Sequence, residues 1–152
     1  MDSRSPRALI DTPPVWLLVC IALAWVQARW LTLWPTPAFV DAAGYALIAL
    51  SVVLFVAAVR EFRRHRTSIV PRETPAALLT SGPFALSRNP IYLADAALLC
   101  GLVLVWDAGA LPLVAAFVAA IQTRFILWEE QECRATFGAD WQIYTTRVRR
   151  WF

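Results

Sequence analysis

Apolar residues along the chain fall into four long runs that are separated by short polar breaks. The runs extend over about Pro14–Trp34, Ala38–Val59, Ile91–Trp106 and Ala110–Trp128. Most of them approach the roughly twenty residues that an α-helix needs to cross a bilayer. The breaks at Pro35–Pro37 and Asp107–Gly109 are short, so each joins two neighbouring runs into a hairpin. The pattern therefore predicts an all-α integral membrane protein with about four transmembrane helices in two hairpins.

Two segments outside these runs have patterns of their own. Arg60–Arg66 is basic and is expected to extend the second helix until Pro71 breaks it. Ala76–Leu86 is apolar but carries turn residues, which predicts a segment at the membrane interface. After the fourth run, aromatic and apolar residues recur at helix-like spacing through Glu129–Phe152, with Gly138 as the expected interruption. We therefore expect a C-terminal amphipathic helical segment.

The composition supports a membrane location. Hydrophobic residues make up 59% of the 152 residues and charged residues only 16%, which is too apolar for the surface of an ordinary soluble domain. This length allows a single membrane domain over residues 1–152, divided into an N-terminal hairpin with the basic loop (1–75) and a C-terminal part (76–152). The three cysteines lack the spacing of metal ligands, so no metal site is expected.

Arginine carries the fixed positive charge, because the chain has no lysine. The positive-inside rule predicts that both termini, the C-terminal helical segment and the loop between the hairpins are cytoplasmic, and we expect a bacterial inner membrane. This topology accounts for the net charge of +3, so no nucleic acid partner is expected, although Arg60–Arg66 can contact anionic lipid. The arginines on the predicted cytoplasmic side are Arg4, Arg7, Arg60, Arg63, Arg64, Arg66, Arg72, Arg88, Arg134, Arg147, Arg149 and Arg150.

Polar residues gather at the predicted cytoplasmic start of the third run. Arg88, Tyr92 and Asp95 are spaced i, i+4 and i+7, which places them on one face if the helix begins near Arg88. Pro90 fits the first turn, where free backbone amides can hold an anionic group, and Asn89 lies beside that face. Because ionisable residues in a membrane segment are candidates for function, we predict a binding site at this end of the helix.

The end of the fourth run carries two glutamates, Glu129 and Glu130. Successive residues of an α-helix point about 100° apart, so we expect only one of them to face the third helix. Together with the arginine and tyrosine of the third run, the glutamates form a polar cluster at the lipid boundary. Such a cluster can bind a zwitterionic molecule and still meet a lipophilic molecule that arrives through the bilayer.

The same residues belong to a series of short motifs between Thr74 and Phe152. The motifs are Gly82-Pro83-Phe84, Ser87-Arg88-Asn89-Pro90-Ile91-Tyr92-Leu93, Glu129-Glu130, Phe137-Gly138, Tyr144 and Val148-Arg149-Arg150-Trp151. Their order and spacing around a hairpin resemble the isoprenylcysteine carboxyl methyltransferase and phospholipid methyltransferase family of integral membrane enzymes. The resemblance implies S-adenosylmethionine as the methyl donor, held at the cytosolic face by residues 76–152.

The resemblance also implies roles for individual residues. The motif that starts at Arg88 and the glutamate pair would bind the cofactor, with a glutamate on its ammonium group. The backbone near Gly82 and Pro90 would approach its adenosine or carboxylate, and Arg88 would hold a carboxylate of the donor or of the acceptor. The expected cofactor-binding residues are Gly82, Pro83, Arg88, Asn89, Pro90, Tyr92, Glu129 and Glu130. The expected catalytic residues are Arg88, Tyr92 and Asp95.

Four positions depart from the pattern of the family. Asn89 replaces the histidine of many relatives, and Ala94 lies where glycine often follows. Cys133 and Trp141 occupy usual leucine and tyrosine positions. An asparagine donates and accepts hydrogen bonds but cannot take up a proton, so the chain lacks the proton acceptor that a histidine-dependent step requires.

The reaction that fits is direct displacement of the sulfonium methyl group by an acceptor held in line, with proximity and orientation supplying most of the acceleration. The acceptor is expected to be a lipophilic small molecule or a lipid-anchored group. A carboxylate, an amine, a phenol and a thiol all remain open. An amine would first have to lose a proton, for which Asp95 and Tyr92 are candidates.

Two other functions remain open. The chain can be a non-catalytic membrane binding or assembly protein that retains this scaffold. A distant likeness of the C-terminal half to membrane sterol reductases would instead make the cofactor a nicotinamide. Membrane lipid is an expected partner in each case, and stabilisation by S-adenosylhomocysteine separates the methyltransferase from the other two.

Overall fold

The computed structural model of the protein describes residues 11–34, 36–70, 73 and 75–152, and this part of the chain is helical without any β-strand. Its long helices are α2 (Pro13–Trp30), α3 (Ala38–Arg64), α4 (Pro90–Trp106), α5 (Leu111–Ile121), α6 (Leu127–Phe137) and α7 (Ala139–Arg147). Two short 3₁₀-helices, η1 (Gly82–Ala85) and η2 (Ala108–Ala110), and the π-helix η3 (Gln122–Ile126) complete it. The predicted breakers Pro35 and Pro71 and the arginines Arg4, Arg7 and Arg72 lie outside the described residues.

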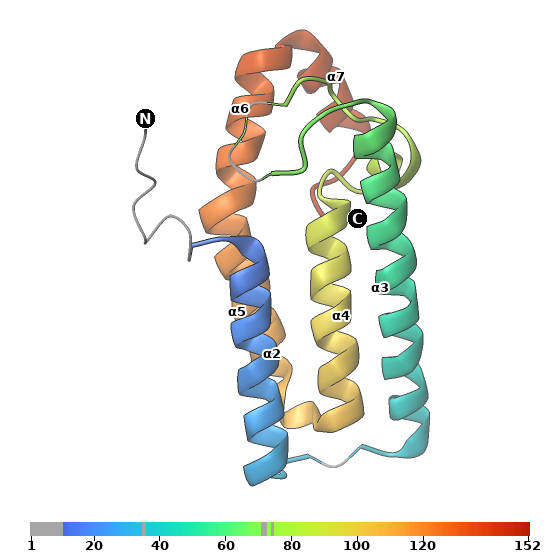
Figure 1. The fold of residues 1–152 in the computed structure, drawn as a ribbon, viewed down its shortest axis with the longest axis vertical. Coiled ribbons are helices and arrows are strands. Elements are labelled where there is room, and N and C mark those ends of the chain that lie inside the picture. The colour runs from blue at the N-terminus through green and yellow to red at the C-terminus, as the bar shows by residue number, and fades with distance from the viewer. Residues whose placement is uncertain (1–10, 35, 71–72, 74) are drawn as a thin grey trace.

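Helix α4 lies at the centre of the bundle, where it packs against α2, α3 and α5 (Figure 1). The elements η2, α5, η3 and α6 follow one another as one long helix, and α6 and α7 extend beyond one end of the bundle (Figure 1). We call this end the arginine-rich end, because α3 finishes there with Arg63 and Arg64 and because Arg88 precedes α4 there. The C-terminal residues return to the same end, beside the start of α4 (Figure 1).

Three helical stretches of the described chain are long and apolar enough to cross a membrane. They are Pro13–Trp30, Ala38–Arg64 and Ala108–Phe137. Helix α4 is also apolar but has only 17 residues, in agreement with the third run as the shortest of the four. The prediction of an all-α integral membrane protein is confirmed.

Two helix ends differ from the predicted ones. The fourth run does not end near Trp128, because its helix continues through α6 to Phe137. No helix-breaking residue follows Trp128 until Gly138, whose φ of 52° separates α6 from α7. The first helix ends at Trp30, earlier than the predicted Trp34. As expected, α3 continues through basic residues to Arg64.

Small residues bring α3 and α4 into close contact. The buried residues of α3 are Gly44, Ser51 and Ala58, which recur at heptad spacing along one face. At Gly101 of α4, a Cβ atom would lie 2.7 Å from the carbonyl oxygen of Gly44. A Cβ atom at Gly44 would in turn lie 2.8 Å from the carbonyl oxygen of Gly101. The two backbones therefore approach so closely that only glycine fits at both positions.

At the opposite end of the bundle, the buried side chain of Asp107 ties two interhelical connections together. Its carboxylate accepts hydrogen bonds from the backbone N–H groups of Leu33 (2.8 Å), Trp34 (3.0 Å) and Gly109 (2.7 Å). Leu33 and Trp34 follow α2, whereas Asp107 follows α4. Burial alone would raise the pKa of this carboxyl group, but the three N–H donors lower the pKa below its usual value.

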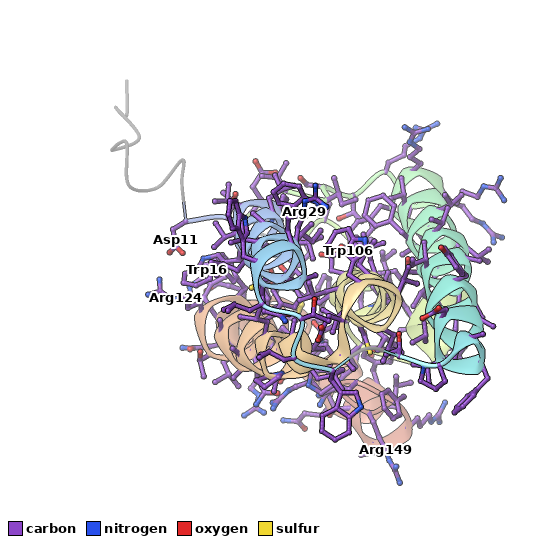
Figure 2. All side chains as sticks on the ribbon, turned by 90° about the horizontal axis from the view of Figure 1, so that it is seen from below. Asp11, Trp16, Arg29, Trp106, Arg124 and Arg149 are labelled. Atoms are coloured by element: carbon purple, nitrogen blue, oxygen red, sulfur yellow. The ribbon has the colours of Figure 1, made fainter. Side chains whose placement is uncertain are left out.

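A third contact fixes the start of α2 against the long helix. Asp11 accepts a hydrogen bond from the indole of Trp16 (3.0 Å) and forms an ion pair with Arg124 of η3 (3.2 Å), and the three side chains lie together on one side of the bundle (Figure 2). The guanidinium carbon of Arg124 also lies 5.0 Å from the centre of the Trp16 ring. Helix α2 is therefore held in place near the arginine-rich end.

The substitution Gly101→Ala is expected to push α3 away from α4, because the added methyl group overlaps the Gly44 carbonyl. We expect the free energy of unfolding to fall by about 1–3 kcal/mol, measured by thermal unfolding in a mild detergent. Ala43→Val is the matched control, because Ala43 is exposed on α3 next to Gly44. Equal stability of Gly101→Ala and the unchanged protein would contradict the close approach.

The substitution Asp107→Ala is expected to cost about 3 kcal/mol of stability, because buried N–H groups lose their acceptor. The pKa of Asp107 is lower in the folded state than in the unfolded state, where it is about 3.9. The contribution of Asp107 to the free energy of unfolding is therefore fully present above about pH 4, and it is lost as the pH falls through the folded-state pKa of Asp107. Unfolding temperatures of both proteins between about pH 7 and pH 2 should converge in acid. Asp41→Ala, which removes the acceptor of one hydroxyl hydrogen bond at the same end, is the control.

Candidate active site

The segment after α7 lies across the start of α4 and is bonded to it. We call residues 148–152 the C-terminal strap. The backbone N–H of Arg88 donates to the carbonyl oxygen of Arg149 (3.0 Å). The side-chain amide of Asn89 donates to the carbonyl oxygen of Arg150 (3.1 Å). The asparagine that departs from the family pattern therefore holds the strap against α4.

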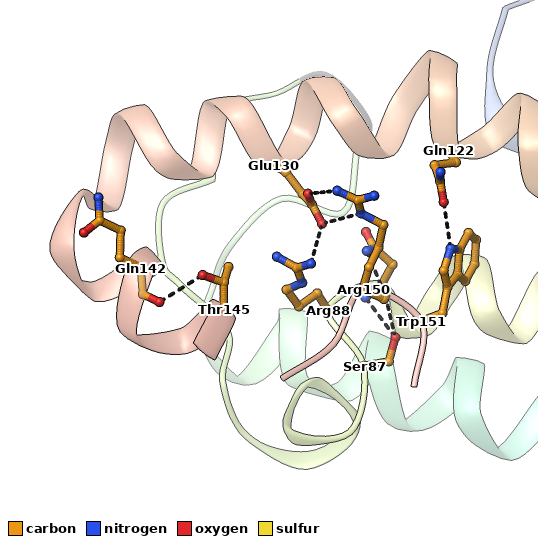
Figure 3. Close-up of polar contacts among 9 residues, drawn as sticks. Ser87, Arg88, Gln122, Glu130, Gln142, Thr145, Arg150 and Trp151 are labelled. Carbon is orange, nitrogen blue, oxygen red and sulfur yellow. Dashed lines mark hydrogen bonds and ion pairs between the residues drawn. The ribbon is translucent and has the colours of Figure 1, made fainter. Parts of the chain in front are cut away.

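Two further hydrogen bonds hold the strap, one at Arg150 and one at Trp151. The hydroxyl group of Ser87 donates to the Arg150 carbonyl oxygen (3.2 Å), and the indole of Trp151 donates to the side-chain oxygen of Gln122 (2.9 Å) (Figure 3). Gln122 is the first residue of the π-helix η3. The strap is thus bonded both to the residues before α4 and to the long helix.

The strap carries Arg150 to the carboxylate of Glu130 on α6. Arg150 donates from Nε to Oε1 (3.0 Å) and from Nη2 to Oε2 (2.7 Å), which is a bidentate pair (Figure 3). Arg88 Nη2 lies 3.4 Å from Oε1 of the same carboxylate (Figure 3). The hydrogen bonds that Arg150 donates to Glu130 raise the pKa of Arg150. Glu130 therefore joins three segments at one point.

Arg88 lies between this carboxylate and an aromatic ring. Its side chain is only 14% exposed, and its guanidinium carbon lies 5.8 Å from the centre of the Trp141 ring of α7. Its Nε–H group is buried and has no hydrogen-bond partner among the described residues. A buried donor without a partner is costly, which makes it a candidate for binding a ligand.

The neighbouring glutamate contacts α4 directly. The buried Tyr92 hydroxyl group donates to Oε1 of Glu129 (2.8 Å). Glu129 therefore faces the third predicted span, whereas Glu130 faces the residues before it and the strap. The two glutamates point in different directions, as predicted, and each meets a different part of the site.

Helix α7 covers the site from outside. Its apolar face, with Trp141 and Tyr144, is buried together with Val148, and the Tyr144 hydroxyl group donates to the carbonyl oxygen of Phe84 in η1 (2.6 Å). Burial raises the pKa of Tyr144, so this phenol stays a hydrogen-bond donor. The amphipathic face predicted for the C-terminal segment packs against the protein itself, with Leu78 of the loop among its partners.

One cavity of about 740 Å³ connects these groups with the interior of the bundle. Its polar half lies at the arginine-rich end, where Arg88, Tyr92, Glu129, Glu130 and helix α7 surround it. Its other half, which we call the helix-lined half, extends between α2 and α3 along the face of α4 that carries Ala94 and Leu98. The volume is in the range of small-molecule sites, about 300–1,000 Å³.

The structure brings most of the predicted site residues to this cavity. The lining includes Arg88, Asn89, Pro90, Tyr92, Asp95, Glu129 and Glu130. Gly82 and Pro83 are not among the described lining residues, although Phe84 beside them is. A Cβ atom on Gly82, whose φ is 56°, would lie 3.1 Å from the side chain of Glu61. Their predicted contact with a cofactor therefore stays a prediction.

Some lining residues were not predicted from the sequence. Glu73 and Glu132 line the polar half, and Ser51 lines the helix-lined half. Arg150 was part of a motif, but its bond to Glu130 was not foreseen. For Ser51 a signal was present, because a polar residue within an apolar span is a candidate for function. For Glu73 and Glu132 the sequence carries no such signal, since both lie among other charged residues.

A family model of phospholipid methyltransferases matches residues 39–140, which is well over half of the chain. The chain therefore belongs to the phospholipid methyltransferase family, and the predicted resemblance is confirmed. The match runs from α3 into the start of α7, so it begins earlier than the motifs that suggested it and ends before the C-terminal strap. A search of curated protein sequences finds no match. Family membership makes the chain a membrane methyltransferase and indicates lipid substrates.

The substitution Tyr144→Phe is expected to loosen α7, because the buried Phe84 carbonyl loses its hydrogen-bond donor. We expect the free energy of local opening of α7 to fall by about 1–2 kcal/mol, measured as faster hydrogen exchange of the α7 amides. Tyr45→Phe makes the same chemical change at an exposed position of α3 and is the control. Unchanged exchange in Tyr144→Phe would show that this hydrogen bond does not hold α7.

Proposed function

We propose that this methyltransferase transfers the methyl group of S-adenosylmethionine to a lipophilic acceptor that resides in the membrane. The observation that carries the proposal is the continuity of this cavity, which joins a charged half at the arginine-rich end to an apolar half between helices. A charged donor and an apolar acceptor can therefore meet within one space.

The residues of the polar half suit the ammonium, the carboxylate and the adenine ring of the donor. The carboxylates of Glu129 and Glu130 are suited to its ammonium group. Arg88, with its unpartnered Nε–H, is suited to its carboxylate. Trp141 offers an aromatic surface for the adenine ring. These assignments rest on the chemistry of the side chains and on their common cavity.

The donor supplies an activated methyl group, so the chain needs to position the reactants more than to activate them. Holding two reactants in line is worth about 7–11 kcal/mol at best. The hydrogen bond between Tyr92 and Glu129 fixes the boundary between the two halves of the cavity. The strap and α7 cover the polar half and keep water from the reacting atoms.

The arginine-rich end is proposed to face the cytoplasm, where the donor is available. Basic residues concentrate at this end in α3, in α6 and in the strap. The positive-inside rule favours this orientation. The described residues at the other end include the acidic Asp41 and Asp107.

Binding of S-adenosylhomocysteine, the unreactive product of the donor, tests the proposal. At a hundred times its Kd, the ligand should stabilise the protein by about 2.7 kcal/mol, measured by thermal unfolding in detergent. Glu129→Gln should weaken binding about 10–100-fold, because a charged hydrogen bond is worth about 1.5–3 kcal/mol. Asp140→Asn makes the same change at an exposed position of α7 and should leave binding intact.

The same measurement separates the rival functions. A folded sample that responds to a reduced nicotinamide dinucleotide but not to S-adenosylhomocysteine would point to a reductase. A folded sample that responds to neither would contradict cofactor binding and favour a non-catalytic role.

A further inference from the structure

The helix-lined half of the cavity has one ionisable side chain among its described lining residues. Among the described residues of α2, α3 and α4 that line it, only Asp95 is ionisable. Its neighbours are apolar, such as Leu17, Val52 and Leu98, apart from the hydroxyl group of Ser51. Asp95 forms no ion pair with Arg88 or Arg124, whose ion-pair partners are Glu130 and Asp11.

We propose that the acceptor is a lipophilic amine whose nitrogen is attached directly to its apolar part, without a phosphate group. This inference rests on the proposed function and names the acceptor that the site would take. Asp95 would bind the nitrogen, and the apolar part would lie along Val52, Phe55 and Leu98.

A carboxylic acid is a poor acceptor in this cavity, because like charges repel. An acceptor carboxylate beside Asp95 would place two negative charges at close range in apolar surroundings. The described lining of the polar half adds Glu73, Glu129, Glu130 and Glu132, against Arg88 as its cation. Glu130 is already paired with Arg150 and lies 3.4 Å from Arg88, and the proposed function assigns Arg88 to the carboxylate of the donor. The described lining therefore offers no further cation to an acceptor anion.

An aminophospholipid is disfavoured by the order of its groups. In such a lipid the phosphate lies between the amine and the acyl chains. Asp95 is five residues after Pro90, which places it about 7.5 Å inside the start of α4. If the amine reached Asp95, the phosphate would lie deeper, beside Ser51 and Leu98, where the described lining offers no cation. Burying a phosphate there without a partner would be costly.

The reaction with an amine balances with the groups present. The protonated amine first gives a proton to the Asp95 carboxylate or to water. Its nitrogen lone pair then forms a bond to the methyl carbon while the bond between carbon and sulfur breaks, and that electron pair stays on sulfur. The positive charge thereby moves from sulfur to nitrogen, and the methylated ammonium can release a second proton when it bears one.

The first experiment compares acceptors in bilayers of phosphatidylcholine, which contains no primary amine. Hexadecylamine, hexadecanoic acid and phosphatidylethanolamine are each offered with S-adenosylmethionine, and methylated products are detected by mass spectrometry. We expect methylation of hexadecylamine at least about tenfold faster than of the other two. Equal or faster methylation of phosphatidylethanolamine or hexadecanoic acid would overturn the inference.

The second experiment tests Asp95 by binding as well as by rate. Asp95→Asn should lower kcat/KM for hexadecylamine by about 100-fold, as expected for loss of a general base. It should also abolish the stabilisation of the protein by hexadecylamine, measured by thermal unfolding in nanodiscs without any methyl donor. Asp41→Asn, at the other end of the bundle, is the control and should change neither quantity.

These readouts separate the two proposals from each other. A protein that binds S-adenosylhomocysteine but neither binds nor methylates hexadecylamine would overturn the acceptor and leave the cofactor proposal standing. A protein that fails to bind S-adenosylhomocysteine contradicts the proposed function, and the binding of hexadecylamine then still decides the role of Asp95. Stabilisation by hexadecylamine that persists in Asp95→Asn would overturn that role.

Discussion

The carboxylate of Glu130 is the point on which the candidate active site depends. It binds Arg150 of the strap through two hydrogen bonds and lies 3.4 Å from Arg88 before α4. Three segments that are distant in the sequence therefore meet at one side chain of α6. Removing Glu130 would leave the partly buried guanidinium groups of Arg88 and Arg150 without this anionic partner, which is costly. The cluster thus links the stability of the fold at this end directly to the shape of the cavity.

The bundle combines close packing on one face of α4 with an opening on another. At Gly44 and Gly101 the backbones of α3 and α4 touch, and Asp107 fixes the connections at that end. Nearer the arginine-rich end, the cavity lies between α2 and α3 along the face of α4 that carries Ala94 and Leu98. The close contact between α3 and α4 keeps these two helices in position, so the cavity nearer the arginine-rich end can enclose a ligand without moving them. Helix α4, which is shorter than the three stretches that are long enough to cross a membrane, lies at the centre of the bundle between them.

Much of this arrangement was predictable from the sequence, and the reasons for the remainder are physical. The long apolar runs identified the spanning helices, because only helices satisfy their backbone groups in a bilayer. Their spacing predicted that Arg88, Tyr92 and Asp95 share one face of a helix that begins near Arg88. The helix begins at Pro90, and the three residues line one cavity. The bond between Glu130 and Arg150 was not predictable, because it depends on how the strap folds back after α7. The end of the fourth helix was misplaced because the polar residues after Trp128 continue the helix instead of breaking it.

The π-helix η3 sets the rotation of everything that follows it. A π-helix holds one residue more per turn than the flanking α-helices, and here it precedes both glutamates. If Gln122–Ile126 had α-helical winding with the same number of residues, the extra residue would turn α6 by about 100° relative to α5. Glu129 and Glu130 would then leave Tyr92 and Arg150, although their identities would be unchanged. Whether the two carboxylates face the cavity therefore depends on the winding of this one helical turn as much as on the presence of glutamates in the sequence.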